Sequence, residues 1–167
     1  MAAMPKGKGG TLKASKAEVL KKGYFTLARN EATKVDHHIR VGAVLATKRC
    51  PVAVGKNSPL KTHPLVSSYN PLKTVHAEFD AIIGIDRSLV QGGTMYVYRE
   101  KFSGELGMAK PCPMCEAFLK HMGLKRVYYT TEDGYDVLNF KDVPSHKQGE
   151  LREMLRAENV TRSASKR

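Results

Sequence analysis

The sequence reads His76-Ala77-Glu78 at one point and Pro111-Cys112-Pro113-Met114-Cys115 at another, and each stretch is predicted to open a helix. Cys112 and Cys115 lie three residues apart, so on a helix their sulfurs project from one face and can bind the same ion. In a first helical turn, unpaired amides and the helix dipole favour the thiolate that a metal requires. With His76 as a third ligand, two sulfurs and one nitrogen suit zinc better than magnesium or calcium.

Three protein ligands leave the fourth position of a tetrahedral zinc open, which distinguishes a catalytic site from a structural one. A water in that position can have its pKa lowered to about 7. Glu78 lies two residues from His76, so we expect it near the metal without ligating it, where it can take a proton from water and pass it to a departing amine. A structural site would need a fourth ligand. His63 and His121 are the alternatives, although His121 is expected to be partly exposed on the cysteine helix.

The ordered pair His76-x-Glu78 and Pro111-Cys112-x-x-Cys115 resembles the zinc-binding signature of the cytidine and deoxycytidylate deaminase superfamily. The resemblance covers approximately residues 15–140 and extends to the order of the predicted elements. It implies a zinc-dependent hydrolytic deaminase, with His76, Cys112 and Cys115 as the zinc ligands and Glu78 as the proton shuttle.

The same resemblance implies where a substrate would lie. Asn57, just after the second strand of the predicted hairpin, matches a position where family members often contact the sugar. The backbone around Ala77 and Pro111 would border the base. His63 lies in the loop before the first motif and is a further candidate for lining the pocket.

Around these motifs, helical and strand patterns alternate, which predicts a layered α/β domain. The resemblance implies a three-layer α/β/α, cytidine deaminase-like fold with a five-stranded mixed sheet. Residues 132–134 are too few for a crossover helix, so the last strand is predicted to pair antiparallel. We predict helices over 15–32, 75–85, 112–122 and 145–158, and strands over 39–46, 51–54, 94–98, 126–131 and 135–140.

The predicted deaminase domain spans residues 15–158, between a flexible basic arm at 1–14 and a basic tail at 159–167. The formal net charge is +12, and both ends contribute to it. Basic tails can bind single-stranded nucleic acid through its phosphates, or they can simply be solvated ends. No apolar run is long enough for a membrane span, and the first residues lack a secretory signal, so we expect a cytoplasmic protein. The resemblance also favours a homo-oligomer. Cys50 is expected to be a small buried hydrophobic residue.

Three functions follow from these observations. The first is conversion of cytosine to uracil in a nucleoside or nucleotide (cytidine, deoxycytidine or deoxycytidylate) with release of ammonia. The second is editing of cytosine or adenine in single-stranded DNA or RNA, motivated by the charge and by Tyr69, Tyr96 and Tyr98. The third is a non-catalytic, zinc-stabilised binding module, against which Glu78 argues, because a structural zinc has no use for an unligated carboxylate.

Overall fold

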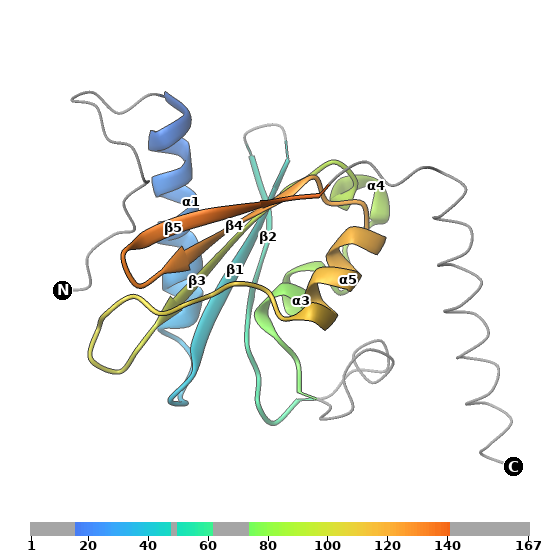
Figure 1. The fold of residues 1–167 in the computed structure, drawn as a ribbon. Coiled ribbons are helices and arrows are strands. Elements are labelled where there is room, and N and C mark those ends of the chain that lie inside the picture. The colour runs from blue at the N-terminus through green and yellow to red at the C-terminus, as the bar shows by residue number, and fades with distance from the viewer. Residues whose placement is uncertain (1–15, 48–49, 62–73, 141–167) are drawn as a thin grey trace, which may run out of the picture.

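A computed structural model describes residues 16–47, 50–61 and 74–140 of the chain. Its centre is a five-stranded mixed sheet with the strand order β2-β1-β3-β4-β5 (Figure 1). The strands are β1 (Arg40–Thr47), β2 (Cys50–Lys56), β3 (Thr94–Glu100), β4 (Arg126–Thr131) and β5 (Gly134–Asn139).

Strand β1 pairs antiparallel with both β2 and β3, and β3 pairs parallel with β4. Strand β5 pairs antiparallel with β4, with Thr131 opposite Gly134. Only Glu132 and Asp133 connect these two strands, and a connection of that length can close a hairpin but cannot hold a crossover helix. The predicted antiparallel last strand is therefore confirmed.

The alternation of side chains along β3 separates two cores. Met95 and Val97 face one side of the sheet, whereas Tyr96 and Tyr98 face the other. Helix α1 (Lys16–Ala32) covers the tyrosine side, and helices α3 (Ala77–Ile82), α4 (Arg87–Val90) and α5 (Pro113–His121) cover the opposite side (Figure 1). The fold is thus the predicted three-layer α/β/α arrangement.

Two glycines let helices lie directly on the sheet. A Cβ atom on Gly42 of β1 would lie 1.9 Å from the backbone oxygen of Ala28 in α1. A Cβ atom on Gly55 of β2 would lie 2.3 Å from the backbone nitrogen of Ala81 in α3. Any larger residue would push these helices outward. Gly55 matters for the site, because it sets how closely the helix that begins beside His76 approaches the sheet.

Three expectations need correction. Cys50 is exposed, because it is the first residue of the edge strand β2. Leu27 of α1, whose three-residue spacing from Tyr24 predicts a place on the buried face of that helix, is 36% exposed, whereas Phe25 is buried. The helix predicted over 75–85 ends at Ile82, since Ile83 has non-helical backbone angles, and the short helix α4 follows it.

Several predictions fall outside the described residues. These are the terminal helix over 145–158, the arm at 1–14, the tail at 159–167, and the loop that contains His63 and Tyr69. Within the described ranges, no helix is long and apolar enough to cross a membrane.

Candidate metal centre and pocket

Two helix N-termini bring the predicted ligands together. His76 is the N-cap residue of α3, with extended backbone angles, and follows Val75, whose carbonyl oxygen accepts a hydrogen bond from Ser58 N at 2.8 Å. Cys112 is the N-cap residue of α5, and Pro113 takes the first helical position, where a missing N–H costs nothing. The rings of Phe79 and Phe118 stack at 4.1 Å with an interplanar angle of 9°, so the two helices pack closely next to the motif.

The three ligand atoms form one cluster. His76 Nδ1 lies 3.2 Å from Cys115 Sγ and 3.6 Å from Cys112 Sγ. In a tetrahedral zinc site with usual bond lengths, a ligating sulfur and nitrogen are separated by about 3.5 Å. The donor set and its spacing therefore fit zinc. Within the described part of the chain, His76, Cys112 and Cys115 form the one group of metal-ligating side chains whose ligand atoms lie this close together.

The cluster already favours a thiolate. A hydrogen bond from the Cys115 thiol lowers the pKa of Cys112 to about 4, and the Cys115 backbone N–H also donates to Cys112 Sγ at 3.4 Å. The same interaction raises the pKa of Cys115, and the hydrogen bond to Cys112 raises the pKa of His76. These hydrogen bonds therefore stabilise the thiolate of Cys112, which is the form that a metal ligand needs.

Glu78 lies directly beside this cluster. It is on the first turn of α3 and only 5% exposed, and burial raises the pKa of its carboxyl group. Glu78 also lines the cavity, so its carboxyl group is buried in the protein yet borders the space where a substrate would bind.

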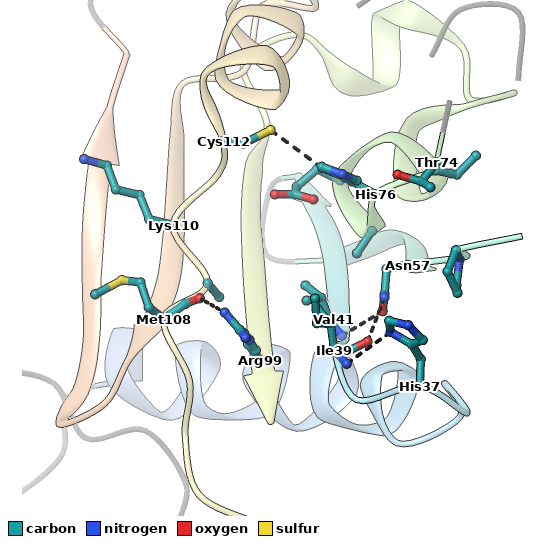
Figure 2. A pocket seen from close by; sticks show the side chains of 15 residues that line it. His37, Ile39, Val41, Asn57, Thr74, His76, Arg99, Met108, Lys110 and Cys112 are labelled. Carbon is teal, nitrogen blue, oxygen red and sulfur yellow. Dashed lines mark hydrogen bonds between the residues drawn. The ribbon is translucent and has the colours of Figure 1, made fainter. Parts of the chain in front are cut away.

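A cavity of about 380 Å³ opens beside these residues (Figure 2). This volume lies within the usual range for small-molecule sites. Its lining comes from the starts of β1 and α3, the ends of β2 and β3, and the segment 108–112 before α5. Ala77 is among the lining residues. Pro111 is buried between two of them, Lys110 and Cys112, but does not itself line the cavity.

Asn57 lines the cavity, and its side chain is held by the backbone of β1. Its Oδ1 accepts from Val41 N and its Nδ2 donates to Ile39 O, both at 2.8 Å. Asn57 therefore extends the pairing of β1 and β2 by one side chain, which fixes its position at the cavity. The other histidine proposed as a fourth ligand, His121, lies in the last turn of α5 and is not part of the ligand cluster.

Sequence reasoning missed several lining residues, including His37, Arg99, Met108 and Lys110. His37 borders the cavity, and its Nδ1 accepts a hydrogen bond from Ile39 N at 3.2 Å. For Arg99 a usable signal existed. Alternate residues of a strand face the same side of the sheet, so Arg99 shares the face of Met95 and Val97, which is the face that carries the site.

Comparisons with known proteins agree with this geometry. A family model described as the cytidine and deoxycytidylate deaminase zinc-binding region matches residues 19–131. No curated protein sequence matches the chain. The solved structures that resemble it include the deoxycytidylate (dCMP) deaminase of cyanophage S-TIM5 without ligand, with a TM-score of 0.51 and 23% identity over 70% of this chain and 86% of that one.

The same cyanophage enzyme in complex with dCMP and dUMP gives a TM-score of 0.50 and 25% identity, over 70% of this chain and 83% of that one. The cytidine deaminase of Mycobacterium leprae gives a TM-score of 0.42 and 19% identity, over 74% of this chain and 94% of that one. The family model spans both motifs and all strands from β1 to β4. The chain therefore belongs to the cytidine and deoxycytidylate deaminase family.

Proposed function

We propose that this protein is a zinc-dependent hydrolytic deaminase that converts cytosine to uracil in a nucleoside or nucleotide and releases ammonia. The observation that carries the proposal is the buried, unligated carboxyl group of Glu78, next to a three-ligand cluster and on the wall of a cavity. A structural zinc site would need a fourth protein ligand and would gain nothing from such a carboxyl group.

In this proposal, His76, Cys112 and Cys115 hold zinc, which when bound lowers the pKa of water and so supplies a nucleophile at neutral pH. Glu78 accepts a proton from the attacking water and delivers it to the departing amino nitrogen, so that cytosine and water become uracil and ammonia. Burial suits Glu78 to both steps, because it raises the pKa of the carboxyl group. The carboxylate then takes a proton from water more readily, and the carboxyl group can hold that proton until it passes to the amino nitrogen.

The lining supports a base held near the metal and a sugar held near Asn57. The cavity wall includes the apolar residues Val41, Val75 and Ala77, which suit the faces of a planar base. Asn57 Nδ2 uses one hydrogen for Ile39 O, and an amide has a second hydrogen to donate. The backbone near Ala77 and Pro111 is proposed to border the base. The similar cyanophage enzyme, solved with dCMP and dUMP, gives deoxycytidylate as a first substrate to test.

Nucleic-acid editing is supported less well. Tyr96 and Tyr98 are 7% and 0% exposed and pack under α1, on the sheet face opposite the cavity, so they offer no surface on which bases could stack. The net charge of +12 is what remains in favour of a polymer, through the basic tails proposed for residues 1–14 and 159–167. A homo-oligomer and the proposed domain limits 15–158 likewise rest on the resemblance.

Ammonia release by purified, zinc-loaded protein tests the proposal. The panel is cytidine, deoxycytidine, deoxycytidylate, adenosine and single-stranded oligonucleotides, with wild type compared against Glu78→Gln. We expect Glu78→Gln to lower kcat by at least about 100-fold, since general acid–base catalysis contributes typically 10²–10⁴-fold. Glu31→Gln is the matched control, because Glu31 is on α1 and pairs with Lys34 at the surface, across the sheet from the cavity.

Release that depends on Glu78 and occurs with a monomer supports the proposed function. Release from oligonucleotides alone supports the editing function instead. If Glu78→Gln and wild type release ammonia equally from a substrate, Glu78 is not the proton shuttle. If no substrate releases ammonia, the proposed function is wrong and the binding-module function gains support.

A further inference from the structure

From the geometry we infer that Arg99 binds a phosphate group of the substrate, so that the substrate is a nucleotide or a nucleotide unit of a chain rather than a nucleoside. The inference rests on the proposed function, because it concerns the same cavity. Arg99 lies near the end of β3, and its partner in the sheet register is Val41, which also lines the cavity.

Arg99 occupies a position where the fold would otherwise place an apolar residue. Along β3, Met95 and Val97 are fully buried on the same face of the sheet, packed against the helices of the site. A guanidinium group on that face is costly unless it is solvated or paired with an anion. Arg99 is half-buried and borders the cavity, so an anion in the cavity could reach it.

No carboxylate of the described residues pairs with Arg99. The ion pairs within those ranges involve other arginines and lysines, and the interaction found for the Arg99 guanidinium is Nη1 donating to the carbonyl oxygen of Met108 at 3.3 Å. By contrast, Arg29 and Arg40 both contact the buried carboxylate of Glu100 on the other face of the sheet. An arginine has five N–H donors, so Arg99 keeps donors for an incoming anion.

The segment after β3 holds Arg99 in this orientation. Gly107 N donates to Arg99 O at 3.0 Å, and Ala109 N donates to Thr130 O of β4 at 2.9 Å, so the segment inserts between the ends of β3 and β4. Thr130 Oγ1 joins the two sides, since it accepts from Arg99 N at 3.1 Å and donates to Gly107 O at 2.9 Å. The Arg99 position is therefore built by backbone contacts on both sides.

Gly107 leaves the space that the Arg99 side chain occupies. A Cβ atom at Gly107 would lie 3.0 Å from both Cγ and Cδ of Arg99. The glycine thus allows the arginine stem to lie against the segment while its guanidinium remains at the cavity.

The charge of the cavity favours a phosphate. Glu78 is the one acidic residue among the described lining residues, and it is buried beside the ligand cluster. Figure 2 shows Arg99 well separated from Cys112 along the same pocket, whereas the side chain of Lys110 extends away from the other lining residues. A cytosine nucleotide has a matching order of groups, with the amino group at one end, for the ligand cluster, and the phosphate at the other, for Arg99. Arginine is suited to phosphate because its planar fork can make two parallel hydrogen bonds.

Kinetics with paired substrates test the inference. Deamination of deoxycytidine, deoxycytidylate and a short cytosine-containing oligonucleotide is compared for wild type, Arg99→Gln and Lys125→Gln. Lys125 is exposed and lies outside the cavity, so Lys125→Gln removes the same charge elsewhere. We expect Arg99→Gln to raise KM for deoxycytidylate about 10- to 100-fold, the range for a lost hydrogen-bonded ion pair, and to reduce the preference for nucleotide over nucleoside. Lys125→Gln should keep the wild-type preference.

Two further variants separate charge from geometry. Arg99→Lys keeps the charge but loses the fork, and should fall between wild type and Arg99→Gln. Gly107→Val keeps Arg99 but displaces its stem, and should also reduce the nucleotide preference. A preference that persists in Arg99→Gln, or wild-type protein that uses deoxycytidine and deoxycytidylate equally well, would overturn the inference. A loss confined to the oligonucleotide supports the phosphate contact but assigns the phosphate to a polymer.

Binding without turnover distinguishes this inference from the proposed function. Deoxyuridine monophosphate and inorganic phosphate are titrated into wild type and Arg99→Gln by calorimetry. Binding that weakens in Arg99→Gln, in protein that releases no ammonia from any substrate, would support the phosphate site and contradict the proposed function. Ammonia release together with binding that does not depend on Arg99 would do the reverse.

Discussion

Cys115 and Cys50 form a matched pair of residues for testing the metal centre. Cys115 is buried, with its sulfur 3.2 Å from His76 Nδ1, whereas Cys50 is exposed at the start of an edge strand. We expect Cys50→Ser to retain roughly one zinc per chain and Cys115→Ser to lose most of it, because zinc in such sites is held by thiolate and a serine hydroxyl is a poor replacement. Elemental analysis after dialysis measures the stoichiometry.

Thermal unfolding provides an independent readout of the same substitution. Zinc that binds the folded chain stabilises it, so chelation should lower the Tm of wild type and of Cys50→Ser but hardly change that of Cys115→Ser. Full zinc content in Cys115→Ser, with a Tm that still responds to chelator, would show that the ligand set is wrong.

At the same scale, sequence spacing was enough to predict which ligands converge, but not which residues surround them. Helical spacing put Cys112 and Cys115 on one face, and their sulfurs do meet His76. The shared spacing of Arg99 with Met95 and Val97 along β3 indicates its face of the sheet, but only the pairing of Arg99 with Val41 shows that it lies at the cavity. The exposure of Cys50 depended similarly on β2 being an edge strand. The roles of Asn57 and Glu78 remain predictions.

At the scale of single elements, two glycines test how α1 packs on β1. A Cβ atom at Gly42 would lie 1.9 Å from Ala28 O, whereas a Cβ atom at Gly23, in the middle of α1, would have nothing within 4 Å. We expect Gly42→Ala to lower the free energy of unfolding by about 3 kcal/mol or more, since backbone must move. Gly23→Ala should raise it by about 0.5–1 kcal/mol through better helix propensity. Urea denaturation measures both, and equal effects of the two substitutions would contradict the close approach of α1.

The sequence predicted best those elements whose structure depends on residues close together in the chain. The β1–β2 hairpin and the β4–β5 hairpin depend on short polar connections, and both formed where expected. Helix α3 is shorter than its apolar pattern predicted. The run of isoleucines continues past Ile82, but the backbone leaves the helix at Ile83, and an apolar residue does not show whether its backbone is helical. No helix or strand was predicted for residues 107–109, the segment that inserts between β3 and β4. Its hydrogen bonds run to Arg99 and Thr130, which are distant in sequence, and no local pattern encodes them.

At the scale of the whole molecule, the two faces of the sheet carry different kinds of residues. The face under α1 holds the packed rings of Tyr24, Phe25, Tyr96 and Tyr98, and Glu100 on the same face pairs with Arg29 and Arg40. The opposite face carries the ligand cluster, Glu78 and Arg99, which lie in the first turns of helices or near the end of a strand. Polar groups can be placed at these ends without breaking a ladder of hydrogen bonds, so stability and chemistry are separated between the two sides.

The net charge of +12 also belongs to the whole molecule, and its effect on polymers can be separated from catalysis. Replacing Lys6, Lys8 and Lys13 with Gln should reduce the slope of the logarithm of the association constant for a single-stranded oligonucleotide, plotted against the logarithm of salt concentration, by up to about 2. Fluorescence anisotropy at several salt concentrations measures that slope.

The matched control replaces Lys22, Lys61 and Lys125 with Gln. These lysines are exposed in the described part of the chain, and their replacement removes the same charge. Equal slopes for the two triple variants would show that the charge acts as a field of the whole protein, and a slope reduced in the first variant alone would assign the contacts to the arm. In either case we expect deoxycytidylate turnover to be unchanged, because the phosphate contact proposed for Arg99 lies within the cavity and does not need the arm.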